Sequence, residues 1–98
     1  MFHDRRLAAI LFTDIVGYTS MMQKDEFHAL TIVRRHNSVV QENSKNHGGE
    51  VVNFYGDGCL AIFPSACEAV QSAVDIQKEL RNETWFYFSN KFIIPRKT

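Results

Sequence analysis

The chain has 98 residues, enough for one domain with one hydrophobic core. Its composition is 45% hydrophobic and 22% charged, which argues against a disordered chain. Eleven basic and eleven acidic side chains cancel, so zero net charge gives no electrostatic footprint for nucleic acid or an anionic membrane. Because no apolar run approaches membrane-spanning length and the N-terminus lacks a signal-peptide pattern, we expect a cytoplasmic protein with neither a membrane segment nor a nucleic-acid partner.

The cysteines and histidines predict no metal centre and no disulfide. Cys59 and Cys67 are expected to be small buried side chains, since nothing in the sequence indicates secretion. His28 and His36 are eight residues apart, too far for the i, i+4 pairing of a two-histidine zinc site. We expect all four histidines to be solvated or packed.

The first half of the chain predicts a buried strand followed by helix. Residues 7–12, "LAAILF", form a continuous apolar run, which is typical of a short strand buried on both faces. From Gly17 to about Asn46 the apolar residues recur with a helical period in two stripes, which predicts one helix or two covering a sheet. The glycines of the segment "HGG", residues 47–49, then end the helix.

The second half predicts a hairpin and an amphipathic helix. Val51–Tyr55 and Cys59–Phe63 are β-rich runs joined by "YGDG", which is typical of a hairpin turn. Ser65 and Glu68 form an S-x-x-E capping box at the start of the next helix, which ends near Arg81. The order strand, helix, strand, strand, helix predicts an α+β chain with an incomplete ferredoxin-like fold, βααββα.

Two acidic residues are predicted to meet at one edge of this sheet. Asp14 lies just past the first strand, and Asp57 lies at the hairpin tip. Two converging carboxylates repel strongly unless a cation lies between them. Oxygen ligands of this kind suit Mg²⁺ or Mn²⁺, and two such ions can hold a nucleophile and a leaving oxygen in line.

The turn after Asp14 predicts a phosphate site. Residues Ile15 to Thr19 pass from strand to helix, where backbone amides and the helix N-terminus favour a phosphate, while Gly17 allows close approach. Metal-binding acids beside such a turn suggest phosphoryl or nucleotidyl transfer. The residues also allow a plainer reading, in which Asp14 is a turn residue or helix cap and the G-D-G is only a hairpin turn.

The segments "FTDIVGYT" and "NHGGEVVNFYGDGCLAIFPS" closely resemble the catalytic domain of class III nucleotidyl cyclases, the adenylate and guanylate cyclase family. The resemblance runs from about Arg6 to Arg81. It divides the chain into residues 6–81, a partial catalytic domain, and residues 82–98, an atypical aromatic tail that matches no family motif.

The resemblance implies the roles of the site residues. Asp14 and Asp57 match the two aspartates that bind two Mg²⁺ or Mn²⁺ ions, and Ile15 matches the position that lends a backbone carbonyl to one metal. The turn that binds the nucleotide phosphates corresponds to Ile15, Val16, Gly17, Tyr18 and Thr19. In the family, one metal activates the ribose 3′-hydroxyl of ATP or GTP for attack on the α-phosphate, which yields a 3′,5′-cyclic nucleotide and pyrophosphate. These sites lie at a head-to-tail interface, so the expected partner is a second cyclase domain in a homodimer or heterodimer.

The chain departs from the family pattern in two places. The position that reads the purine, four residues before Asp57, is Asn53, which can hydrogen-bond a base in either sense or be an ordinary strand residue. The family's other purine-reading residue and its transition-state Asn and Arg follow the region that ends at residue 81, and the surroundings of Asn90 and Arg96 match no family motif. The abrupt change of character suggests a truncated or frameshifted gene product.

Three hypotheses about function follow. The first is a metal-dependent nucleotidyl cyclase domain, impaired in this chain. The second is a catalytically inactive metal- or nucleotide-binding module that pairs with a complete cyclase domain. The third, a palm-type nucleotidyl transferase acting on nucleic acid, shares the two-carboxylate chemistry but is disfavoured by the neutral composition.

Overall fold

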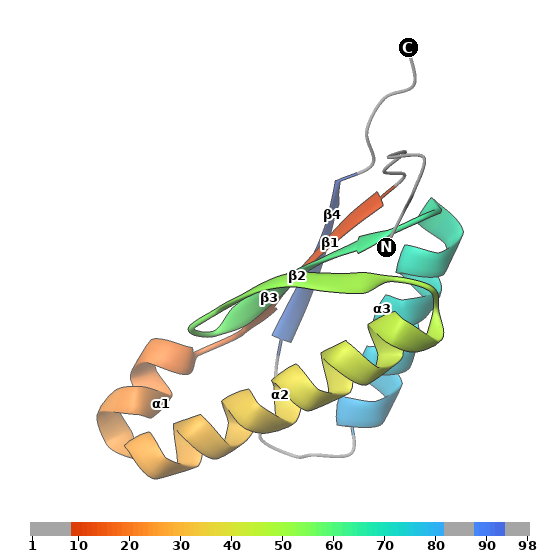
Figure 1. Ribbon diagram of the computed structural model, residues 1–98. Coiled ribbons are helices and arrows are strands. Elements are labelled where there is room, and N and C mark those ends of the chain that lie inside the picture. Colours follow the sequence, from red (N-terminus) through yellow and green to blue (C-terminus); the bar gives the residue numbers. More distant parts are fainter. Residues whose placement is uncertain (1–8, 82–87, 94–98) are drawn as a thin grey trace.

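The computed structural model describes residues 9–81 of the chain and, for the backbone alone, residues 88–93. The elements follow the order of a ferredoxin-like β-α-β-β-α-β unit whose first helix is divided in two (Figure 1). In chain order they are β1 (Ala9–Ile15), α1 (Tyr18–Lys24), α2 (Glu26–Asn46), β2 (Glu50–Tyr55), β3 (Gly58–Phe63), α3 (Ala66–Arg81) and β4 (Phe88–Ile93).

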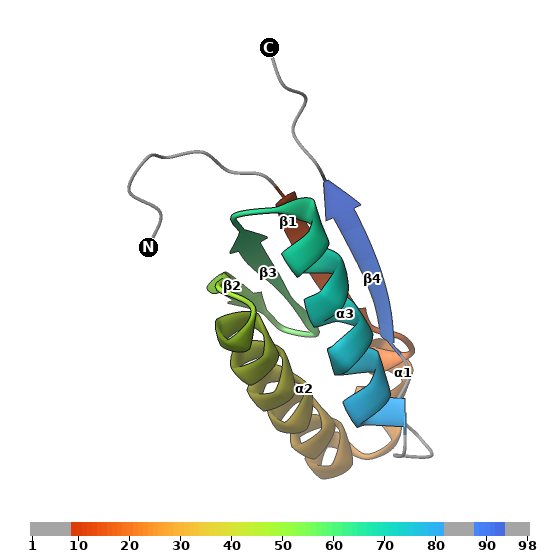
Figure 2. The ribbon, with the colours of Figure 1, turned by 90° about the vertical axis from the view of Figure 1, so that its right-hand side faces the viewer.

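The four strands form one antiparallel sheet in the order β2-β3-β1-β4. Strand β1 is central, and α2 and α3 pack together on one face of the sheet (Figure 2). This arrangement confirms the predicted α+β, ferredoxin-like fold. The buried core between helices and sheet comprises Ala9, Leu11, Ile15, Ile32, Val39, Val40, Cys59, Ala61, Phe63, Ala69, Ala73, Ile76 and Leu80.

Strand β1 is longer than predicted and is buried mainly on one face. Its residues alternate between buried positions facing the helices and less buried positions facing away, as a half-covered strand requires. Asp14 therefore lies within the strand, opposite Gly58, rather than just past its end. The strand extends this far because β3 and β4 both pair with it as far as Asp14.

The final strand, which was missing from the predicted incomplete fold, is present as β4 within the predicted tail. Its register on β1 runs from Ile10 opposite Ile93 to Ile15 opposite Phe88. Strand pairing uses backbone N–H and C=O groups, so a segment without an alternating pattern can fill an edge that would otherwise be unpaired. The fold therefore has the final strand of the ferredoxin-like unit, while the division of the chain at residue 82 stays a prediction.

Helix boundaries follow the local capping chemistry. Asp25 separates α1 from α2: its backbone is extended, and its side chain accepts a 3.1 Å hydrogen bond from the His28 amide. The predicted capping box of α3 is half formed, because Ser65 Oγ accepts from the Glu68 amide at 3.1 Å. The Glu68 carboxylate is instead bonded to His47.

Candidate active site

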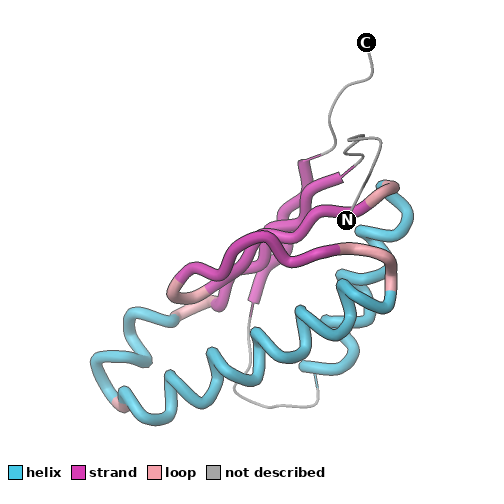
Figure 3. Tube along the Cα trace, in the orientation of Figure 1, coloured by secondary structure: helices cyan, strands magenta, loops and turns pink. Residues whose placement is uncertain are grey.

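The ends of β1 and of the β2–β3 hairpin bring Asp14 and Asp57 together. Asp14 pairs with Gly58 across the two strands, and the Ile15 amide donates a 2.8 Å hydrogen bond to the Asp57 carbonyl oxygen. The hairpin tip and the turn after β1 accordingly lie side by side (Figure 3). The predicted meeting of the two acidic residues is therefore present in the fold.

Both aspartates line one pocket of about 270 Å³. Asp14 is exposed and Asp57 is half-buried, so each can contact a bound ion or ligand. Apolar and polar neighbours complete the walls of the pocket, which is lined by Phe12, Thr13, Asp14, Tyr55, Asp57, Gly58 and Cys59.

Gly58 is the glycine of the G-D-G motif that the packing requires. A Cβ atom at Gly58 would collide with the Thr13 carbonyl oxygen and would lie 3.3 Å from the Asp14 Cα. A Cβ at Gly56 would meet no atom within 4 Å. The absence of a side chain at Gly58 therefore allows β3 to begin directly against the residue that carries the first carboxylate.

The predicted phosphate-binding segment forms the turn between β1 and α1. Gly17 has φ 78° and ψ 16°, a left-handed conformation that glycine adopts without strain. The first helical hydrogen bond of α1 runs from the Met21 amide to the Gly17 carbonyl at 3.0 Å, so the amides of residues 18–20 precede that ladder. None of the predicted turn residues Ile15 to Thr19 lines the aspartate pocket, so the turn lies adjacent to the pocket rather than within it.

Asn53 lies apart from the two aspartates. It is exposed on the edge strand β2, opposite Leu60, next to a register shift between Val51 and Asn53. It does not line the aspartate pocket. Its predicted contact with a purine would therefore need a ligand that reaches beyond this pocket, or a second chain.

A buried polar group beneath the pocket was not predicted from the sequence. Thr13 Oγ1 lies 2.8 Å from His36 Nε2 and 3.3 Å from Cys59 Sγ, and His36 Nδ1 lies 3.0 Å from Asn37 Oδ1. Burial lowers the pKa of His36, an effect that the Asn37 hydrogen bond and the charges of Asp14 and Asp57 oppose. His36 is packed, as one of the two expected environments for the histidines, but its hydrogen bond to Thr13 was not predicted. The sequence signal for it was a histidine in the buried stripe of α2.

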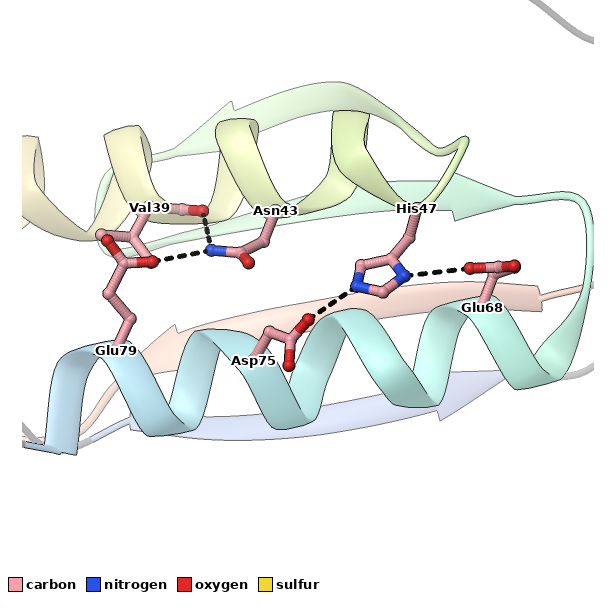
Figure 4. A network of polar contacts seen from close by, with 6 residues as sticks. All are labelled: Val39, Asn43, His47, Glu68, Asp75 and Glu79. Carbon is pink, nitrogen blue, oxygen red and sulfur yellow. Dashed lines mark hydrogen bonds and ion pairs between the residues drawn. The ribbon is translucent and has the colours of Figure 1, made fainter.

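A second polar group joins α2 to α3 at the end of α2 (Figure 4). His47 lies 2.9 Å from Glu68 Oε1 through Nδ1 and 2.7 Å from Asp75 Oδ2 through Nε2. Hydrogen bonds to Asp75 and Glu68 raise the pKa of His47. The same interface holds Asn43, whose amide donates to the Val39 carbonyl at 2.9 Å and to Glu79 Oε1 at 3.1 Å.

The cysteines differ from each other. Cys59 is buried, as expected, whereas Cys67 is exposed on α3, and both are free thiols. Burial raises the pKa of the Cys59 thiol, although its contact with Thr13 opposes that effect. Cys59 is therefore a neutral thiol packed against the site.

The two carboxylates would suit an Mg²⁺-type ion that also takes ligands from outside this chain. Among residues 9–81, no cluster of three or more His, Cys, Asp or Glu side chains forms a cage that could hold a metal alone. Mg²⁺ is commonly bound by one or two carboxylates together with substrate phosphates and water, which is what two carboxylates lining an open pocket can supply.

Comparison with known proteins identifies the fold and its relatives. A "Putative adenylate cyclase 3" of Rhizobium meliloti (strain 1021) is 40% identical over 77 residues, 78% of this chain. An "Adenylate cyclase" of Mycosarcoma maydis is 31% identical over 77 residues, 79% of this chain. Over most of its length the chain is similar to class III adenylate and guanylate cyclase domains. No protein-family model matches it.

Solved structures of this family superpose on most of the chain. An adenylate/guanylate cyclase/hydrolase from Silicibacter pomeroyi gives a TM-score of 0.79 at 28% identity and covers 92% of this chain. The guanylyl cyclase Cya2 gives a TM-score of 0.78 at 25% identity and covers 94%. This chain spans 57% and 55% of those two structures, and 13% of the Rhizobium relative.

Proposed function

We propose that this chain carries the metal- and phosphate-binding half of a nucleotidyl cyclase site. Asp14 and Asp57 would hold Mg²⁺ or Mn²⁺, with the backbone carbonyl of Ile15 as a further ligand, while ATP or GTP is bound. The observation that supports this function is the single pocket lined by both carboxylates, at strand ends joined by the hydrogen bond from Ile15 to Asp57. The family relationship supplies the reaction, formation of a 3′,5′-cyclic nucleotide with release of pyrophosphate.

The residues of this chain would bind and orient the triphosphate. The carboxylates fix the position of the ions, whose chemistry is to activate the ribose 3′-hydroxyl and neutralise charge on the α-phosphate. The amides of the turn at Val16 to Thr19 would hold the phosphate oxygens, since they lie at the start of a helix and Gly17 permits the turn. Tyr55 and Phe12 line the pocket and would restrict the water that reaches it.

The opposite half of the site would come from a second cyclase domain. Asn53 is exposed on an edge strand and is available to read the purine in such an assembly, in a homodimer or heterodimer. Residues 82–98 contain no match to the family's transition-state Asn and Arg. Loss of one such donor costs about 2.7–4 kcal/mol, so a pair of 98-residue chains is expected to be a poor catalyst.

A second candidate function is that of a binding module. In that case the chain would be inactive alone and would act by pairing with a complete cyclase domain in cyclic-nucleotide signalling. The same lack of a matched transition-state half in residues 82–98 favours this alternative. A cytoplasmic location is proposed with both functions, because ATP and GTP are the expected ligands.

One assay tests these proposals. The purified chain is incubated with Mn²⁺ and ATP or GTP, alone and with a complete class III domain, and cyclic nucleotide is measured. Activity of the chain alone that disappears in Asp57→Asn would establish the enzyme and contradict the expected impairment. Activity that rises only with the complete domain, and only with Asp14 and Asp57 intact, would support the binding module. No cyclic nucleotide from the chain alone, together with no rise over the complete domain alone, would contradict both.

A further inference from the structure

Three buried polar side chains join β1, β3 and α2 directly behind the aspartate pocket. Thr13, His36 and Cys59 are 4%, 0% and 1% exposed. Thr13 and Cys59 are cross-strand partners, and His36 reaches them from the helix layer. A buried polar side chain costs free energy unless it is hydrogen-bonded, so this group must be considered as a unit.

The hydrogen bonds of the group form one consistent chain. Asn37 Oδ1 is an acceptor, so His36 Nδ1 carries the proton and its Nε2 accepts from the Thr13 hydroxyl at 2.8 Å. The Thr13 oxygen can then accept from the Cys59 thiol at 3.3 Å. This assignment gives each donor one acceptor and requires a neutral imidazole, which burial favours.

The group lies next to both acids along the paired strands β1 and β3. Asp14 pairs with Gly58 on β3 and with Ser89 on β4. The next cross-strand pair is Thr13 with Cys59, and these residues lie one position before Asp14 and two positions after Asp57. The buried group therefore supplies a side-chain hydrogen bond between β1 and β3 at the pair next to Asp14 and Gly58.

We propose that Thr13, His36 and Cys59 form a buried brace that keeps Asp14 and Asp57 at the separation a divalent cation needs. The three are positioning residues, since they act through the backbone of the two aspartates. His36 fixes the Thr13 hydroxyl from α2, and Thr13 fixes the start of β3 through Cys59. The part of this inference that concerns the cation rests on the proposed function.

The brace can be tested without metal by following the Ile15 amide, whose bond to the Asp57 carbonyl reports on the joined strand ends. Thr13→Val keeps the shape of the side chain but removes the hydroxyl and leaves His36 Nε2 without its donor. We expect hydrogen exchange of the Ile15 amide to accelerate by about fivefold or more. Thr13→Ser, which restores the hydroxyl, should return exchange to the wild-type rate.

A matched control is Ser72→Ala. Ser72 is a fully buried hydroxyl on α3, and its oxygen has no hydrogen-bond partner among the described residues. It should leave the Ile15 exchange rate unchanged. If Thr13→Val does not fold, Cys59→Ala removes only the thiol contact and should accelerate exchange by about twofold, because a thiol is a weak donor.

The cation is tested by titrating the full chain with Mn²⁺ and measuring free Mn²⁺ by electron paramagnetic resonance. Thr13→Val should weaken the apparent affinity about fivefold, while Thr13→Ser and Ser72→Ala should match wild type. Wild-type Ile15 exchange in both Thr13→Val and Cys59→Ala would overturn the brace. Faster exchange with unchanged Mn²⁺ affinity would overturn its role toward the cation. A wild-type chain that binds no Mn²⁺ would contradict both the proposed function and the role of the brace toward the cation. The exchange rates of the Ile15 amide would still test whether the brace holds the strand ends together.

Discussion

The amide of Ile15 donates a 2.8 Å hydrogen bond to the carbonyl oxygen of Asp57, residues 42 positions apart in the chain. This bond extends the pairing of β1 with β3 by one step beyond Asp14 and Gly58. The hairpin tip is consequently held against the end of β1, and both carboxylates reach the same pocket. Four predictions follow from this arrangement and from the helix interface.

Gly58 is expected to be far less tolerant of substitution than Gly56. In Gly58→Ala, the added methyl group would overlap the Thr13 carbonyl and force β1 and β3 apart, with an expected loss of about 1–3 kcal/mol in the free energy of unfolding. Gly56→Ala is the matched control, because its Cβ meets nothing within 4 Å. Urea denaturation of both variants measures the difference, and equal stabilities would contradict the close approach of the strands.

Gly17 is expected to be required for its backbone conformation rather than for space. Its φ of 78° is unfavourable for a residue with a Cβ, although no atom lies within 4 Å of the position that a Cβ would occupy. Gly17→Ala should therefore lower the free energy of unfolding by about 1–2 kcal/mol, and Gly17→Asn by less, since Asn tolerates this region. Thermal unfolding of the two variants shows which is less stable. If the larger Asn side chain destabilised more than Ala, a steric cause would be indicated instead.

Divalent cation should stabilise the native chain. A ligand that binds only the folded state at a hundred times its dissociation constant adds about 2.7 kcal/mol to the free energy of unfolding. We expect Mn²⁺ to raise the unfolding temperature of the wild-type chain and EDTA to reverse the rise. Asp14→Asn and Asp57→Asn should abolish the response. A rise that persists in both variants would place the cation elsewhere.

His47 should make the stability of the chain depend on pH. Its pKa is raised by Asp75 and Glu68, so the stabilisation it contributes is complete below the unfolded-state pKa of 6.5 and is lost as pH rises through its higher folded-state pKa. Because both carboxylate side chains are nearly half exposed, at 47% and 46%, the expected difference is below about 1 kcal/mol.

Urea unfolding at pH values below 6.5 and above the folded-state pKa of His47 measures the pH dependence. The contribution of His47 is the difference in unfolding free energy between wild type and His47→Gln. Asp75→Asn should reduce the pH dependence only in part, because Glu68 still raises the pKa of His47. Glu79→Gln is a suitable control, since that carboxylate bonds Asn43 rather than His47 and should leave the pH dependence intact. His36 has a lowered pKa, so its effect on the free energy of unfolding has the opposite sign: as pH falls below 6.5, the unfolded chain binds the proton more readily and the native chain loses stability. The difference between wild type and His47→Gln removes this contribution.

Much of the fold was predictable because its signals are local. The apolar run before Asp14, the helical periods and the "YGDG" turn depend on neighbouring residues, so they indicated each element except β4 and placed both aspartates near joined strand ends. The boundaries were less accurate: β1 continues to Ile15 because its partners continue to pair with it.

The features that the sequence did not predict all depend on contacts between distant residues. Nothing near Thr13 in the chain indicates that His36 accepts its hydroxyl, or that His47 lies between two carboxylates of α3. The position of Asn53 outside the aspartate pocket likewise depends on how β2 pairs with β3.

By itself, the sequence determined the order and type of most elements, the two carboxylates, the glycine turn and the relationship to class III cyclases. The tertiary structure decided that β4 completes the sheet on β1, that Gly58 is the glycine required by the packing, and that a buried Thr13–His36–Cys59 group lies behind the acids. The physical reason is that hydrophobic period and turn chemistry are properties of adjacent residues. Strand pairing, close backbone approach and buried hydrogen bonds exist only when distant segments are packed together.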